Sequence, residues 1–171
     1  MPVIKEDEYA NIFQITMTES AASTLTYFEI NLGLTLFQKK AILINRVIVD
    51  WGLTALASIT AVGDALIVAI TQSNQPTSLV LRDSSCVWKA QKGAKINGTP
   101  ANLELVNVVE TYDLTAIPGG GEFIVPTPLY GAIHGVSLAA AMEVTMRMYF
   151  QVIDLKPEQY FELLESRHFY G

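Results

Sequence analysis

The chain has 171 residues, of which 50% are hydrophobic and 16% are charged, and its 17 acidic and 11 basic residues give a formal net charge of −6. The length predicts a single domain over residues 1–171, and the apolar fraction excludes a disordered chain, because so apolar a chain buries enough surface to offset the entropy lost on ordering. No window reaches about 18 uninterrupted apolar residues, which argues against a membrane-spanning helix, so the hydrophobic excess belongs in a core or in surfaces that contact other protein.

Apolar residues recur with period two over most of the length, and turn residues interrupt them often, which is typical of an all-β domain. We expect a β-sandwich over residues 12–155 with at least eight strands. The candidate strands are residues 13–18, 24–32, 41–51, 65–71, 78–82, 86–90, 103–111, 122–125, 129–133 and 141–155.

Two of these strands are apolar on both faces. In residues 41–51 the polar side chains Arg46 and Asp50 share a face with isoleucines, and residues 65–70 are wholly aliphatic. The other face of the first strand carries Leu43, Val47, Val49 and Trp51. Strands of this kind are buried on both sides, by a second layer or by a neighbouring subunit. Part of the apolar surplus is therefore expected to face neighbours.

The clearest strand is residues 141–155. One face carries an uninterrupted apolar row, namely Met142, Val144, Met146, Met148, Phe150 and Val152, and the other face is mostly polar. Pro157 suits the first position of a helix, which we predict over residues 157–168. Its apolar stripe is expected to pack on the β domain and consists of Tyr160, Phe161, Leu163 and Leu164.

Basic residues show no pattern for binding a nucleic acid backbone. Such proteins cluster Lys and Arg, whereas residues 1–10 hold one lysine against three acidic residues. The nucleic-acid candidate is the group Lys89, Lys92 and Lys95, which we interpret, together with Arg82, as a solvated loop face. No strong nucleic-acid binding is expected.

No catalytic, metal or cofactor site emerges from the motifs. Cys86 is the only cysteine, which excludes an intrachain disulfide and a Cys-based zinc site, and we interpret it as a small packing residue. His134 and His168 lie far apart in the sequence. Glu29 and Asp50 would suit a glycosidase if they met across strands within about 10 Å, but we interpret them as solubilising carboxylates. We therefore expect no enzyme and no cofactor.

The strand count and the two ends of the chain resemble the single jelly-roll capsid proteins of small or tailless viruses. The resemblance rests on residues 24–36 followed by 41–51, and on residues 141–155 followed by the helix. It implies an eight-stranded jelly roll whose copies, alone or with other capsid proteins, tile a virion shell assembled in the host cytoplasm. The chain begins without the basic arm of many such proteins, so the resemblance implies that genome contact is weak or made by another component, as in shells that enclose a lipid layer or use separate packaging proteins.

Loops rich in proline and glycine are candidates for contact between subunits, because proline limits the entropy lost on docking. The C-terminal helix either caps its own sandwich or docks on a neighbour. The candidate interface residues are Gly119, Gly120, Gly121, Pro126, Pro128, Phe161 and Leu164.

The alternative function is a carbohydrate- or ligand-binding β-sandwich. Aromatic side chains on such a sandwich stack on sugar rings. The candidate platform residues are Tyr27, Trp51, Trp88, Tyr112, Tyr130 and Tyr149. The absence of a secretory signal pattern at the N-terminus speaks against this class, whose members are usually exported.

Overall fold

The computed structural model describes residues 11–34, 39–79, 85–93, 108–117, 119–125 and 128–168. In these residues the chain forms nine β-strands and two α-helices. The strands are β1 (Asn11–Thr18), β2 (Thr26–Ile30), β3 (Lys40–Asp50), β4 (Ala65–Thr71), β5 (Cys86–Gly93), β6 (Val109–Asp113), β7 (Glu122–Ile124), β8 (Leu129–Val136) and β9 (Glu143–Asp154). The helices are α1 (Leu53–Ala57) and α2 (Pro157–His168).

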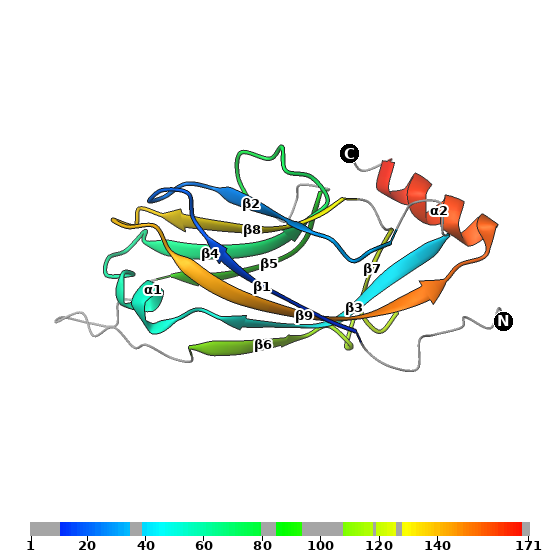
Figure 1. Cartoon of the computed structure of the whole chain (residues 1–171), viewed down its shortest axis with the longest axis horizontal. Coiled ribbons are helices and arrows are strands. Elements are labelled where there is room, and N and C mark those ends of the chain that lie inside the picture. The colour runs from blue at the N-terminus through cyan, green and yellow to red at the C-terminus, as the bar shows by residue number, and fades with distance from the viewer. Residues whose placement is uncertain are drawn as a thin grey trace.

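The strands build two antiparallel sheets that face each other (Figure 1). The five-stranded sheet has the order β1-β9-β3-β6, with β7 also paired to β3, and the four-stranded sheet has the order β2-β8-β4-β5. Apart from the pairs β4–β5 and β6–β7, each strand is followed in the chain by a strand of the other sheet. This order is that of a jelly roll, so the predicted fold class is confirmed.

Two details of the strand prediction are corrected. In chain order, the sixth of the eight strand positions of the jelly roll is shared by two strands, because β6 pairs with residues 46–50 of β3 and β7 with residues 42–44. A strand over residues 78–82 is wrong for its described part, since Ser78 and Leu79 are not in a strand.

The core lies between the two sheets and follows the predicted alternation in β9. Met142, Val144, Met146, Met148 and Phe150 are all buried in it. Fully buried side chains from both sheets meet them, among them Met17, Trp51, Leu66, Ile70 and Ile133. The inward face of β9 therefore organises the interior of the sandwich.

A β-bulge in β3 separates Leu43 from Val47, Val49 and Trp51, which were predicted to share its face and which all lie in the core. The register between β3 and β9 shifts between Ile44 and Arg46, which leaves Asn45 as an extra residue. Ile42 and Ile44 consequently join the core, whereas Leu43 is buried on the opposite face of the strand. One inserted residue reverses the inside and outside of every position before it, so a strict period of two assigned Leu43 to the wrong face.

The outward face of β4 is covered by the same chain. All seven residues of β4 are buried, and Leu79 packs with Ile67, Ala69 and Ala132 outside the four-stranded sheet. Two side chains hold this cover: the Tyr27 hydroxyl donates to the Pro76 carbonyl at 2.7 Å, and Lys89 Nζ donates to the Leu79 carbonyl at 2.7 Å. Of the two predicted alternatives for β4, a second layer or a neighbouring subunit, the described residues show cover from the same chain.

The C-terminal helix is confirmed, and it lies at the end of the sandwich where β3 begins and β9 ends (Figure 1). Tyr160 is buried, but Phe161 is 60% exposed, so Phe161 does not belong to the packed stripe. The side chains of Leu163 and Leu164 lie outside the described part of the chain. No helix among the described residues is long and apolar enough to cross a membrane.

Candidate functional site

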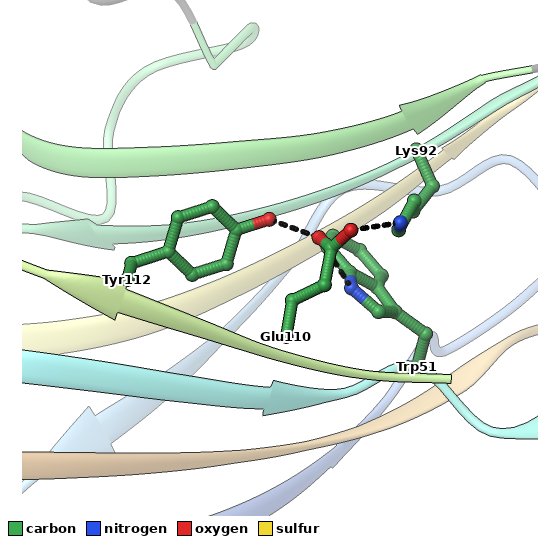
Figure 2. Close-up of polar contacts among 4 residues, drawn as sticks. All are labelled: Trp51, Lys92, Glu110 and Tyr112. Atoms are coloured by element: carbon green, nitrogen blue, oxygen red, sulfur yellow. Dashed lines mark hydrogen bonds and ion pairs between the residues drawn. The ribbon is translucent and has the colours of Figure 1, made fainter. Parts of the chain in front are cut away.

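A polar cluster joins the two sheets along one edge of the sandwich (Figure 2). Lys92 comes from β5 of the four-stranded sheet, Glu110 and Tyr112 come from β6 of the five-stranded sheet, and Trp51 follows β3. We call these four residues the edge cluster. Because β5 and β6 are the terminal strands of their sheets, contacts between them close this edge.

The alternation of β6 turns its two cluster residues inward. Glu110 lies opposite Val49 and Tyr112 opposite Val47, and both valines are in the core. On the other sheet, Lys92 lies opposite the fully buried Leu66. The charged pair therefore sits at the rim of the core, with the side chain of Lys92 19% exposed and that of Glu110 26% exposed.

Glu110 is the centre of the edge cluster. Its carboxylate accepts hydrogen bonds from the Lys92 ammonium, the Tyr112 hydroxyl and, at 3.3 Å, the indole Nε1 of Trp51. The ring of Trp88 meets that of Tyr112 edge to face, with centroids 5.2 Å apart. A carboxylate that accepts from three donors on both sheets is a structural tie between the sheets.

The same contacts shift two pKa values in opposite directions. Burial acts to raise the pKa of Glu110, but the hydrogen bonds from Lys92, Tyr112 and Trp51 and the charge of Lys92 outweigh it, so the pKa falls below its ordinary 4.5. The pKa of Tyr112 is raised above its ordinary 10.0. Burial has the largest effect, and the hydrogen bond to the Glu110 carboxylate and the negative charge of that carboxylate add to it. At pH values between 4.5 and 10.0, Glu110 is therefore ionised and Tyr112 is neutral.

The stabilisation by the edge cluster is expected to be lost at both ends of the pH scale. The depressed pKa of Glu110 means that its contribution is present above pH 4.5 and lost as the pH falls, while the raised pKa of Tyr112 means that its contribution is lost as the pH rises above 10. Glu110→Gln should lower the free energy of unfolding by about 1 kcal/mol at neutral pH.

Urea denaturation of the wild type and Glu110→Gln across this pH range measures the difference. It should shrink as the pH falls below 4.5, because the Glu110 carboxylate then becomes protonated, first in the unfolded state and at lower pH in the folded state. Glu29→Gln is the matched control, because Glu29 is an exposed carboxylate on β2, outside the edge cluster, and loses its charge through the same substitution. A difference that stays constant with pH contradicts the assignment.

The lysines proposed for nucleic-acid contact are engaged within the chain. Lys89 and Lys92 lie on β5, so the interpretation as a solvated loop face is wrong for them. Lys92 belongs to the edge cluster, and Lys89 donates a hydrogen bond to the Leu79 carbonyl. A phosphate would have to replace these contacts. Lys95 and Arg82 lie outside the described residues.

The candidate interface residues lie on separate elements. Gly119, Gly120 and Gly121 form the turn before β7, Pro128 is the exposed residue before β8, and Phe161 is on α2. Pro126 and the side chain of Leu164 lie outside the described part. Gly121 also has a role within the chain, because a Cβ at this position would collide with the Ile44 carbonyl.

The predicted aromatic platform does not form. Trp51 and Trp88 are buried, so neither can stack on a sugar. Tyr27 and Tyr130 contact each other edge to face, with centroids 6.4 Å apart, on strands of the four-stranded sheet. Tyr149 lies under Arg46 on the five-stranded sheet. The exposed aromatic rings are thus divided between two sheets.

The remaining chemical candidates are also separated. Glu29 is on β2 and Asp50 on β3, which belong to different sheets, so the idea that they meet across adjacent strands is wrong. The described residues contain no group of three or more His, Cys, Asp or Glu side chains that could hold a metal ion. Cys86 is partly buried and packs against the small cluster outside the four-stranded sheet.

An open groove of about 370 Å³ lies on the five-stranded sheet, on the face that points away from the core. The groove carries one acidic and one basic side chain, Asp50 and Arg147. Arg147 donates from Nε and Nη2 to the Gln14 side-chain oxygen, at 3.0 and 2.7 Å. Its lining residues are Gln14, Ile48, Asp50, Val109, Thr145 and Arg147.

No protein-family model and no curated protein matches the sequence. Among solved structures, the fold is similar to VP1 of Trichodysplasia spinulosa-associated polyomavirus, which was solved in complex with sialylated precision glycooligomers. The TM-score is 0.42 and the sequence identity 10%, over 84% of this chain and 95% of that chain. The likeness concerns the fold and says nothing about what this chain binds.

Proposed function

We propose that this chain is a structural subunit that assembles with copies of itself into the shell of a virus particle. The observation that carries the proposal is the jelly-roll strand order of two facing antiparallel sheets. Jelly rolls of two facing sheets recur in the capsid proteins of viruses. The same proposal includes assembly in the host cytoplasm, contacts with other capsid proteins and contact with an internal lipid layer.

The surface also offers apolar side chains for contacts with other protein. Single exposed apolar residues are ordinary, but here they occur at both ends of the sandwich and on both terminal strands of the five-stranded sheet. They are Ile12, Leu53, Val62, Val109, Ile117 and Phe161. An assembling subunit needs at least two contact regions to extend beyond a dimer.

The assembly state tests the proposal directly. We expect the purified full chain to form particles or large oligomers, visible by negative-stain imaging and by size-exclusion chromatography with light scattering. The measurement should cover a range of salt concentration, pH and protein concentration. A strictly monomeric protein under all of these conditions would contradict the proposed function.

Phe161→Ser should leave the fold intact and weaken assembly. The side chain is 60% exposed, so its loss should change the free energy of unfolding by less than about 0.5 kcal/mol. An aromatic anchor in an interface is worth about 2 kcal/mol, so the association constant should fall by about tenfold or more. Light scattering measures the assembly and thermal unfolding measures the fold.

Glu162→Ser is the control, since Glu162 is exposed and follows Phe161 on α2 but is not one of the apolar contact residues. Equal assembly of Phe161→Ser and the wild type would show that α2 is not a docking element. Unfolding of Phe161→Ser would instead support a helix that caps its own sandwich.

A further inference from the structure

The four terminal strands of the two sheets are protected to different degrees. A terminal strand exposes a row of backbone N–H and C=O groups that can pair with another chain, and proteins block such pairing with charges, bulges, prolines or short strands. At one edge of the sandwich, β5 and β6 carry charged residues, and the edge cluster ties them together. At the other edge, β2 has five residues and includes Glu29.

β1 has none of these protections. It runs for eight residues, NIFQITMT, without a charged side chain or a proline. Its register with β9 is continuous from Asn11 to Thr18, so no bulge turns it away. Within the described residues, β1 pairs with β9 alone. The long, straight and uncharged edge is therefore open to another strand.

Side chains on both faces of β1 remain partly uncovered. Phe13 and Ile15 point toward the core, yet each is only partly buried, whereas Met17 on the same face is fully buried. On the outer face, Ile12 is 60% exposed. An additional strand beside β1 would cover apolar surface at Phe13 and Ile15 as well as satisfying the backbone groups.

We infer that β1 pairs antiparallel with β1 of a second copy of this chain, across a two-fold axis, so that the two five-stranded sheets become one continuous sheet. A second copy fits because β1 is neutral and its pattern is self-complementary. With Ile15 opposite Ile15 of the second copy, Phe13 lies opposite Met17 and Gln14 opposite Thr16. Over residues 13–17, apolar residues then meet apolar residues and polar residues meet polar ones, while Ile12 lies opposite Thr18 at each end.

Thr16→Lys tests the pairing, and Thr145→Lys is its matched control. Thr16 and Thr145 are joined by a hydrogen bond of 2.9 Å on the outer face, so both variants lose the same contact and add the same charge. Only Thr16 lies on the terminal strand. In the inferred dimer two lysines at position 16 lie near the two-fold axis, where like charges oppose pairing.

Analytical ultracentrifugation should show that the dissociation constant of the dimer rises at least about tenfold in Thr16→Lys and stays unchanged in Thr145→Lys. Hydrogen exchange on the wild type gives a second readout that needs no variant. The amides of residues 11–18 should become more protected as protein concentration rises, while those of β6 should not. This readout keeps the test decisive even if Thr16→Lys fails to fold.

As a route to self-assembly this inference rests on the proposed function, but the outcomes separate the two. Equal dimerisation of the wild type and a folded Thr16→Lys, or exchange at residues 11–18 that does not depend on concentration, overturns the β1 pairing and leaves assembly through other surfaces standing. A dimer that Thr16→Lys abolishes, without particles in the wild type, supports the pairing and contradicts the shell. A wild type that stays monomeric overturns both.

Discussion

Glu19→Ala should lower the free energy of unfolding by about 4 kcal/mol, the largest effect that we expect from any single polar side chain of this protein. Glu19 is 3% exposed, and its carboxylate accepts from the backbone N–H groups of Gly135 at 2.6 Å, Met142 at 3.0 Å and Thr24 at 3.1 Å. Removing the acceptor leaves buried donors without partners, and hydrogen bonds to a charged group are the stronger kind.

The effect of Glu19 spreads over several segments because of where its partners lie. Thr24 is in the turn from β1 to β2, Gly135 is on β8, and Met142 precedes β9. The Glu19 N–H also donates to the Met142 carbonyl at 2.9 Å. One side chain thus connects both sheets at this end, and its loss should lower the cooperativity of unfolding as well as the midpoint.

Urea denaturation followed by circular dichroism measures the effect of Glu19→Ala. Glu143→Ala is the control, because Glu143 is an exposed carboxylate that accepts one hydrogen bond, from Thr18, and should cost less than about 0.5 kcal/mol. Glu19→Gln should fall between the two, since its amide keeps one acceptor and places N–H groups against a backbone donor. A loss below about 1 kcal/mol for Glu19→Ala would refute the role assigned to this carboxylate.

Gly121→Ala should destabilise the fold by about 3 kcal/mol. A Cβ at this position would collide with the Ile44 carbonyl oxygen and lie 2.9 Å from Leu43 Cδ1. The carbonyl belongs to β3, which cannot move without breaking its pairing with β9. The φ angle of +155° adds strain for any residue with a side chain.

Gly120→Ala separates backbone strain from the collision. Gly120 has a φ angle of +81°, but nothing lies within 4 Å of a Cβ there, so only the strain of about 1 kcal/mol remains. Thermal unfolding of both variants gives the comparison. If the turn serves only as a contact between subunits, the two variants should instead fold equally well and differ in assembly.

Much of the fold could be predicted because it depends on local alternation. The apolar row of β9 and the proline at the start of α2 are local signals, and both elements form where they were expected. The bulge at Asn45 has no such signal, since the sequence of β3 is compatible with either face in the core. The sharing of one strand position by β6 and β7 depends likewise on how each of them pairs with β3.

The edge cluster was missed for a related reason. Glu110 and Tyr112 are spaced for one face of a strand, which indicates a shared face but not whether it points inward. Their partners, Lys92 and Trp51, are distant in sequence, and only the alignment of two terminal strands brings them together. A lysine rated as solvated thereby became part of an ion pair at the rim of the core.

The amino-acid sequence was sufficient to determine an all-β domain with a C-terminal helix and too few basic residues for a basic arm, because composition and periodicity act residue by residue. Only the tertiary structure decided which apolar faces are covered within one chain and which are left uncovered. β4 is apolar on both sides but is covered by Leu79, whereas β1, a less apolar strand, keeps an open edge. Burial depends on which distant segments meet, and that is a property of the folded chain. Among the described residues β1 pairs with β9 alone, and its other edge is therefore where we infer that a second copy binds.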